Sequence, residues 1–214
     1  MNILDFLKEA DRLTKGKTHV KSRPVLRSAY QIGDLIYSTD STCMLVMDTK
    51  QGLEQEFNQE FRFDNAKPGE HGTYPENVTR ILEGALKNSK MEVTFRANRE
   101  NTKAALDLMK AAKGERAELT IGGEVRFTAQ VEDGASRIEA LASWDVEKNT
   151  NPEESDWGFF SADLVLFLLD LLHKETRNVV GEFPVQVYWG GKTKPVVFGF
   201  SNLQFLMLPL RIRD

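Results

Sequence analysis

The sequence predicts an α+β protein in which helices cover one face of antiparallel sheets. Strand-like segments come in runs, and isolated helical segments separate the runs, which is the order typical of this class. From residue 91 onward the predicted order is one strand, one helix and three strands, and this order then repeats. Of the 214 residues, 41% are hydrophobic and 28% are charged, as in ordinary soluble folded proteins.

The first 50 residues predict a helix followed by short strands. Residues 2–14 place apolar side chains at helical spacing, with Asn2 as the N-cap and Gly16 as the stop. Residues 20–48 are rich in β-branched, aromatic and apolar residues, and Gly33 with Asp34 supplies a turn. We therefore expect an antiparallel meander after the first helix.

Residues 49–87 are more polar. Residues 56–64 alternate phenylalanines with charged and polar residues, which predicts one edge strand, and a loop rich in Gly and charge follows. Residues 76–87 predict a short helix, which Gly84 weakens. Its inward residues are expected to be Val78, Ile81, Leu82, Ala85 and Leu86.

The rest of the chain contains the duplicated pattern. Asn98 or Asn101 caps a helix that runs through Ala112, and Ser161 opens a second helix that runs through Leu172. A polar connector over residues 148–156 joins the two copies. The strands are expected at residues 91–97, 117–123, 124–134, 136–146, 157–160, 183–191, 194–200 and 205–212.

No motif for catalysis or for a cofactor is visible. Cys43 is the sole cysteine, which excludes a disulfide framework and a cysteine-based zinc site, and His19, His71 and His173 lack ligand spacing. The sequence holds no Gly-rich phosphate loop, no G-x-S-x-G elbow and no H-E-x-x-H motif. We therefore expect a protein that is not an enzyme and that binds no cofactor and no metal.

Hydropathy, cysteine content and net charge indicate the cellular compartment and the kinds of partner to expect. The longest apolar stretch, Leu164–Leu169, is far shorter than the ~20 residues of a membrane span, and the N-terminus lacks the apolar core of a signal peptide. A lone cysteine suits a reducing compartment, so a cytoplasmic protein without a membrane partner is expected. The net charge of −4 does not indicate a nucleic-acid binder, but it is compatible with a local basic face.

Motifs occur in order near the two ends of the chain. Residues 23–47 contain Arg-Pro-Val-Leu, then Gly-Asp-Leu, then Ser-Thr-Asp-Ser-Thr-Cys-Met, and residues 208–212 read Leu-Pro-Leu-Arg-Ile. These segments resemble bacterial DNA polymerase sliding clamps, which read Arg-Pro-(Ile/Val)-Leu, Gly-x-Leu, Ala-Thr-Asp-x-His-Arg-Leu and a final (Leu/Val)-Met-Pro-(Met/Val/Leu)-Arg-(Leu/Ile). Thr42, Cys43 and Met44 replace the usual His, Arg and Leu. Residues 74–76, Tyr-Pro-Glu, resemble the Tyr-Pro-Asp that introduces a following clamp domain.

The resemblance implies a reduced-size DNA-clamp fold made of repeated β-α-β-β-β units. It implies a truncated clamp-like domain over residues 1–73, a linker helix over 74–90 and a second clamp-like domain over 91–214. Clamps are rings whose helices line a central hole and whose sheets form the outer wall. This chain is then expected to be a replication processivity factor that encircles double-stranded DNA without reading its sequence.

The resemblance also implies partners and sites. The partners are DNA, a DNA polymerase, clamp-loader-like proteins and copies of the same chain. With three or four inward helices per chain, a ring of about a dozen helices needs a trimer or tetramer. The expected DNA-binding cations are Lys8, Arg12, Lys15, Arg80, Arg99, Lys103, Lys110, Lys113 and Lys174. The expected partner-peptide pocket is bordered by Thr39, Asp40, Thr42, Leu208, Pro209, Leu210 and Arg211.

Other interpretations stay open. The helix cations also fit an ordinary solvated face. The helix over residues 161–172 is apolar on too wide a face, so we expect another element or subunit to cover it, and we favour an interface. A clamp-derived module that captures a replication protein through this helix without encircling DNA is one alternative. An α+β enzyme with an unrecognised site is the other.

Overall fold

The computed structural model describes residues 1–52, 58–112, 114–133, 136–177 and 179–211, and from residue 130 to 140 the backbone alone. The chain divides into two compact units. The first is Met1–Gly84 with Asn202–Leu206, and the second is Ala85–Ser201 with Met207–Asp214. The division lies inside helix α3 (Val78–Lys87), and the first unit takes a strand from near the end of the chain.

The first unit is an antiparallel sheet with helix α1 (Ile3–Thr14) on one face. Its strands lie in the order β4-β1-β2-β3-β12. They are β1 (Ser28–Ile32), β2 (Leu35–Thr39), β3 (Cys43–Asp48), β4 (Asn58–Arg62) and β12 (Leu203–Met207). The sheet confirms the expected meander and, with β4 outermost, the expected edge strand.

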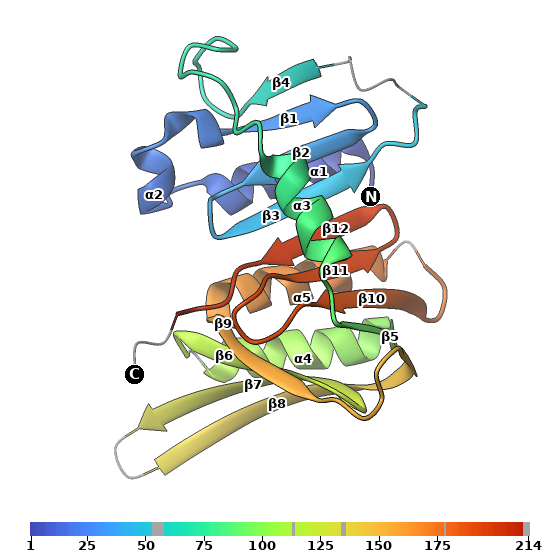
Figure 1. Cartoon of the computed structure of the whole chain (residues 1–214). Helices are drawn as coiled ribbons and strands as arrows, with labels where there is room; N and C mark the ends of the chain where they lie inside the picture. The colour runs from blue at the N-terminus through green and yellow to red at the C-terminus, as the bar shows by residue number, and fades with distance from the viewer. Residues whose placement is uncertain (53–57, 113, 134–135, 178, 212–214) are drawn as a thin grey trace. The chain divides into compact units, whose positions relative to one another are not determined.

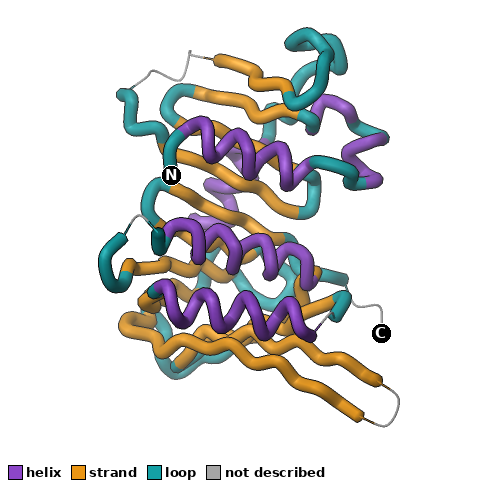
Figure 2. Tube along the Cα trace, turned by 180° about the vertical axis from the view of Figure 1, so that it is seen from behind, coloured by secondary structure: helices purple, strands orange, loops and turns teal. Residues whose placement is uncertain are grey.

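Helix α1 forms for the reasons that its sequence suggests. Asn2 is its N-cap, and the Asn2 side chain accepts a hydrogen bond of 2.9 Å from the backbone N–H of Asp5. Phe6, Ala10 and Leu13 recur at helical spacing and are buried, and α1 contacts β1 and β2. The opposite side of the helix therefore faces solvent (Figure 2).

Two short helical segments precede β1, where a strand was expected. Helix α2 (Thr18–Lys21) and the 3₁₀ turn η1 (Pro24–Leu26) occupy this stretch. Val25 and Leu26 were expected to begin the first strand, and this expectation was wrong. Pro24 stands at the first position of η1, where its fixed φ suits a helical turn and its missing N–H costs nothing.

The first unit's part of α3 lies on the other face of the sheet from α1, as the two opposite views show (Figures 1 and 2). Val78 and Leu82 are buried as expected, but Ile81 is 39% exposed, which corrects its expected inward position. The segment before α3 is anchored by Tyr74, which stacks on Tyr30 of β1 with ring centroids 5.5 Å apart.

The second unit confirms the expected duplication. Its first copy is β5 (Met91–Ala97), α4 (Arg99–Ala112), β6 (Arg116–Ile121), β7 (Glu124–Asp133) and β8 (Ser136–Asn149). Its second copy is β9 (Asp156–Ser161), α5 (Ala162–Glu175), β10 (Phe183–Trp189) and β11 (Val196–Phe200), followed by β12. The strands of this unit lie in the order β11-β10-β5-β8-β7-β6-β9 and pair antiparallel.

Helices α4 and α5 pack against one another and lie on one face of this unit's strands (Figure 2). Asn98 caps α4: its side chain accepts a hydrogen bond from Asn101 N, and the Asn101 side chain accepts one from Asn98 N, both at 2.9 Å. Leu108 was expected on the apolar face, but it is 45% exposed, and Leu106 and Met109 are buried instead. Ser161 is the N-cap of α5, but its side chain makes no capping hydrogen bond.

Other elements of the same chain cover the wide apolar face of α5. Its buried residues are Ala162, Leu164, Val165, Leu168, Leu169, Leu171, Leu172 and Glu175. They are covered by α4, β6 and β9. The favoured expectation, that a subunit interface covers this helix, is therefore not needed to explain its composition.

Candidate nucleic-acid interface and partner site

The solvent side of α1 carries three of the four cations expected in the first unit. Lys8, Arg12 and Lys15 are exposed. Lys8 pairs with Asp5 at 3.0 Å, and Arg12 pairs with Glu9 at 2.8 Å. Surface pairs of this kind bind their partners weakly, so both cations are available to an anionic ligand that competes for them.

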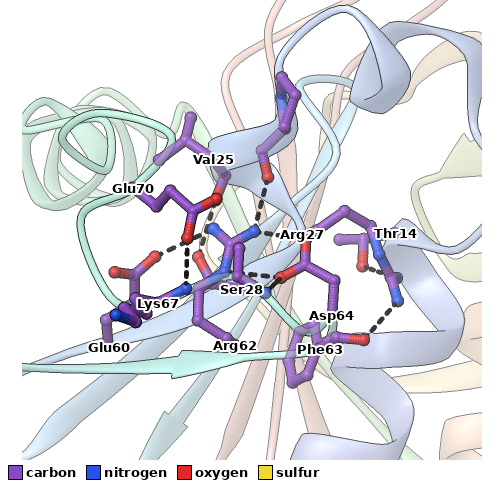
Figure 3. Close-up of polar contacts among 12 residues, drawn as sticks. Thr14, Val25, Arg27, Ser28, Glu60, Arg62, Phe63, Asp64, Lys67 and Glu70 are labelled. Atoms are coloured by element: carbon purple, nitrogen blue, oxygen red, sulfur yellow. Dashed lines mark hydrogen bonds and ion pairs between the residues drawn. The ribbon is translucent and has the colours of Figure 1, made fainter.

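The position of α1 is held by Arg27, and the loop after β4 by Arg62; the sequence analysis singled out neither arginine. Arg27 reaches across from the end of η1, and its guanidinium donates to Asp11 Oδ1 at 2.5 Å, to Thr14 Oγ1 at 2.9 Å and to Phe63 O at 3.1 Å (Figure 3). Arg62 on β4 pairs with Asp64 at 2.5 Å and with Glu60 at 3.2 Å. These charge-assisted contacts fix α1 and the loop after β4 to the same sheet edge.

Arg80 does not join the α1 cations, although it belongs to the same unit. Arg80 is exposed on α3, which lies across the sheet from α1 within the first unit (Figure 1). Lys113 lies outside the described residues.

The solvent side of α4 carries the cations expected in the second unit. Arg99, Lys103 and Lys110 are exposed, and their spacing places them on one side of the helix. We call these three residues the α4 face. Lys103 is ion-paired with Asp107, whose pKa its hydrogen bond lowers. Among the described residues, Arg99 and Lys110 have no carboxylate within ion-pair distance, although Lys110 contributes to the lowered pKa of Asp107.

Lys174, near the end of α5, pairs with Asp170 at 2.9 Å. Two further residues at this end were missed as site candidates. His173 lies beside α4, with its Nδ1 3.4 Å from Thr102 Oγ1, and Arg177 follows the helix and is exposed. Contact between Thr102 and His173, which are 71 residues apart in the sequence, cannot be read from local spacing.

The Thr39–Asp40 segment, expected to border a peptide pocket, is a tightly bonded turn between β2 and β3. Asp40 is 1% exposed, and its Oδ1 accepts hydrogen bonds from Thr42 N at 2.8 Å, Thr42 Oγ1 at 2.7 Å and Cys43 N at 3.0 Å. Thr39 Oγ1 donates to Cys43 O at 2.6 Å. In this chain the Thr-Asp pair therefore holds its own turn, which is the function of Asx turns. Thr42 is exposed beside it.

The other expected border, Leu208–Arg211, begins where β12 ends at Met207. The expectation of a strand was wrong for residues 208–211, because the strand ends before Pro209, and residue 212 lies outside the described residues. Leu210 N donates to Phe159 O of β9 at 2.7 Å, which ties the segment to the second unit. Leu208 is 38% exposed and Leu210 is 42% exposed, so both present apolar surface to solvent.

The cysteine and the other ionisable groups give no sign of catalysis. Burial raises the pKa of the Cys43 thiol well above its ordinary value, and the nearby Asp40 carboxylate adds to this, so the thiol stays protonated and unreactive. Among the described residues, no three His, Cys, Asp or Glu side chains come close enough to hold a metal ion. Each helix of the described chain is too short or too polar to span a membrane.

No protein-family model and no curated protein match the sequence. The fold, however, matches solved bacterial clamps. The DNA polymerase sliding clamp of Bacillus subtilis matches 98% of this chain with a TM-score of 0.62 and 15% identity. DNA polymerase III subunit beta of Borrelia burgdorferi matches 98% with a TM-score of 0.66 and 12% identity. The Helicobacter pylori beta clamp, solved with a DNA ligase peptide bound, matches 98% with a TM-score of 0.62 and 14% identity.

The chain has the sliding-clamp fold. It matches 63% of the B. subtilis chain, 61% of the B. burgdorferi chain and 63% of the H. pylori chain, so it spans less than two thirds of the length of these clamps. This confirms the α+β class and the clamp architecture expected from the residues at 23–47 and 208–212.

Proposed function

We propose that this chain is a clamp-like replication processivity factor that encircles duplex DNA in the cytoplasm and performs no catalysis. The observation that carries the proposal is the α4 face, where Arg99 and Lys110 stand without carboxylate partners in a chain of the clamp fold. Unpaired cations spaced along one helix suit the regularly spaced phosphates of DNA and read no base sequence. Lys8, Arg12 and Lys15 on α1 are proposed as further DNA contacts, on the first unit.

Enclosure requires several copies of the chain. The described residues contain three long helices, α1, α4 and α5, whereas α3 lies on the other face of the first unit's sheet. If α1, α4 and α5 line the hole, a ring of about a dozen helices needs four chains. If α3 is counted as well, the same ring needs three chains. We propose a closed cyclic tetramer or trimer.

The partners are proposed from the exposed leucines of the C-terminal segment. Leu208 and Leu210 offer apolar surface beside a strand edge, where a short apolar peptide of a DNA polymerase or a clamp-loader-like protein would bind. The Helicobacter pylori beta clamp was solved with a DNA ligase peptide bound. By resemblance, Thr39, Asp40 and Thr42 of the first unit are also proposed to contact partners, with Asp40 acting through the turn that it holds.

The double variant Arg99→Glu/Lys110→Glu tests the DNA surface. We expect it to lower the affinity for a duplex by about 10- to 100-fold at about 0.1 M salt and to reduce the salt dependence of binding, because fewer phosphates are neutralised. Fluorescence anisotropy with a labelled duplex measures both quantities.

The matched control is Lys90→Glu/Lys194→Glu, which reverses two exposed lysines outside the helices of the same unit. The control should retain most of its affinity. An equal loss in both double variants would show that net charge, and not the α4 face, determines binding.

A further inference from the structure

The start of α4 and the end of α5 form one cationic corner in the second unit. Thr102, in the first turn of α4, lies beside His173, in the last turn of α5, with 3.4 Å between Thr102 Oγ1 and His173 Nδ1. Arg99 lies three residues before Thr102, and Arg177 lies four residues after His173. The helical spacing places Arg99 on the same side of α4 as Thr102. Arg177 follows the end of α5, and both arginines lie close enough to His173 to lower its pKa.

The hydrogen bonds of Thr102 determine how His173 is oriented. The Thr102 hydroxyl donates to Asn98 O at 2.7 Å, so towards His173 it can only accept. This arrangement favours the neutral tautomer of His173 that carries its proton on Nδ1 and a lone pair on Nε2. The imidazole is half-buried, so Nε2 can take up a proton from solvent.

The charges around His173 are mainly positive. The pKa of His173 is lowered by burial and then by Arg177, Arg99 and Lys103, whereas Asp170 acts in the opposite direction. Lys174 and Asp170 form an ion pair, as do Lys103 and Asp107, and these pairs largely cancel. The charged residues on β6 and β9, the strands that α5 also packs against, are Arg116, Glu118 and Asp156.

We propose that Arg99, His173 and Arg177 bind one backbone phosphate of duplex DNA, and that His173 takes up a proton from solvent when the phosphate binds. The proposal rests on the proposed function, since it requires the outer side of α4 and α5 to face DNA. The proposal adds a phosphate contact by His173 and a pH dependence of DNA binding, neither of which follows from the lysines and arginines of the helices.

The physical reason is linkage. In the free protein, Arg99 and Arg177 disfavour a third positive charge on the imidazole. A bound phosphate neutralises that field and accepts a hydrogen bond from Nε2–H, so the charged form becomes favoured and the pKa of His173 rises. The pKa of His173 is then higher in the DNA complex than in the free protein. DNA affinity therefore rises as the pH falls through the interval between these two pKa values.

The experiment measures duplex affinity at pH values of about 7.5 and 5.5 for the wild-type protein and for His173→Gln, which is polar but cannot be charged. We expect the wild-type Kd to fall by about 3- to 10-fold more than that of His173→Gln, since a shift of one pKa unit corresponds to tenfold. His71→Gln, on an exposed loop of the first unit, is the matched control and should keep the wild-type response.

A second readout does not depend on the stability of a variant. Histidine NMR titration of the wild-type protein with and without duplex should show one of the three histidines, His173, with a pKa that rises on DNA binding. Binding with the same pH response in His173→Gln, or a His173 pKa unchanged by DNA, would overturn this inference and leave the proposed function standing. Absence of duplex binding at every pH would overturn both.

Discussion

Replacing Phe127 with alanine is expected to lower the free energy of unfolding of the second unit by about 3–5 kcal/mol. Phe127 on β7 is fully buried, and its ring centroid lies 6.2 Å from that of Trp144 and 6.0 Å from that of Phe198. Trp144 in turn contacts Phe95 at 5.2 Å, so the four rings join β5, β7, β8 and β11. Removing the central ring leaves a cavity that these neighbours cannot fill without moving their strands.

Urea denaturation followed by tryptophan fluorescence measures this loss, because all three tryptophans (Trp144, Trp157 and Trp189) belong to the second unit. Phe127→Leu is the control, and its loss should stay near about 1–1.5 kcal/mol because most of the volume is kept. An alanine variant as stable as the leucine variant would show that these rings are not the core of this unit.

Replacing Asp40 with alanine is expected to cost about 2–4 kcal/mol in the first unit. Asp40 is 1% exposed, and its Oδ1 accepts hydrogen bonds from Thr42 and Cys43. Without the carboxylate, the buried backbone N–H of Cys43 has no acceptor, and the turn with Ser41 at a φ of 77° loses its support. Urea denaturation followed by far-UV circular dichroism measures the change, since the first unit has no tryptophan.

Asp40→Asn keeps an oxygen that can accept these bonds and should lose less than half as much. Asp5→Ala, at an exposed position whose carboxylate pairs with Lys8, should change stability by less than about 1 kcal/mol. A loss for Asp40→Ala no larger than that for Asp5→Ala would contradict the structural function of this turn. In that case the only function left for the Thr39–Asp40 pair would be in a partner site.

Local signals were sufficient for most of the fold. The order of elements in the second unit, the caps at Asn2 and Asn98 and the edge position of β4 were all predicted from periodicity and capping residues. Each of these features is determined within a few residues of the chain, and that is the distance over which sequence patterns are informative.

Features that depend on distant contacts were not predicted. The wide apolar face of α5 suggested an interface, but the helix and strands that cover it come from other parts of the same unit. His173 and Arg177 gave no signal, because their position beside Thr102 depends on how α4 packs against α5. Arg27 was missed for a similar reason, since Asp11 and Phe63 come from segments on either side of it.

Two local errors had a visible cause in the sequence. Val25 follows Pro24, and Leu208 precedes Pro209; both were included in strands because of their apolar character. Proline cannot donate a backbone hydrogen bond, and it limits the conformation of its neighbour, so strands are interrupted there. At these two positions proline was the stronger indicator of the strand boundary, whereas Pro184 lies inside β10.

The most direct measurement of enclosure compares the protein bound to a nicked circular DNA with the protein bound to the same DNA after one cut makes it linear. The circle has no end from which a ring can slide, so after gel filtration at moderate salt we expect the protein to stay with the circle and to be lost from the linear form. Equal retention on the two DNAs would contradict encirclement and would indicate a protein that binds the duplex only from outside.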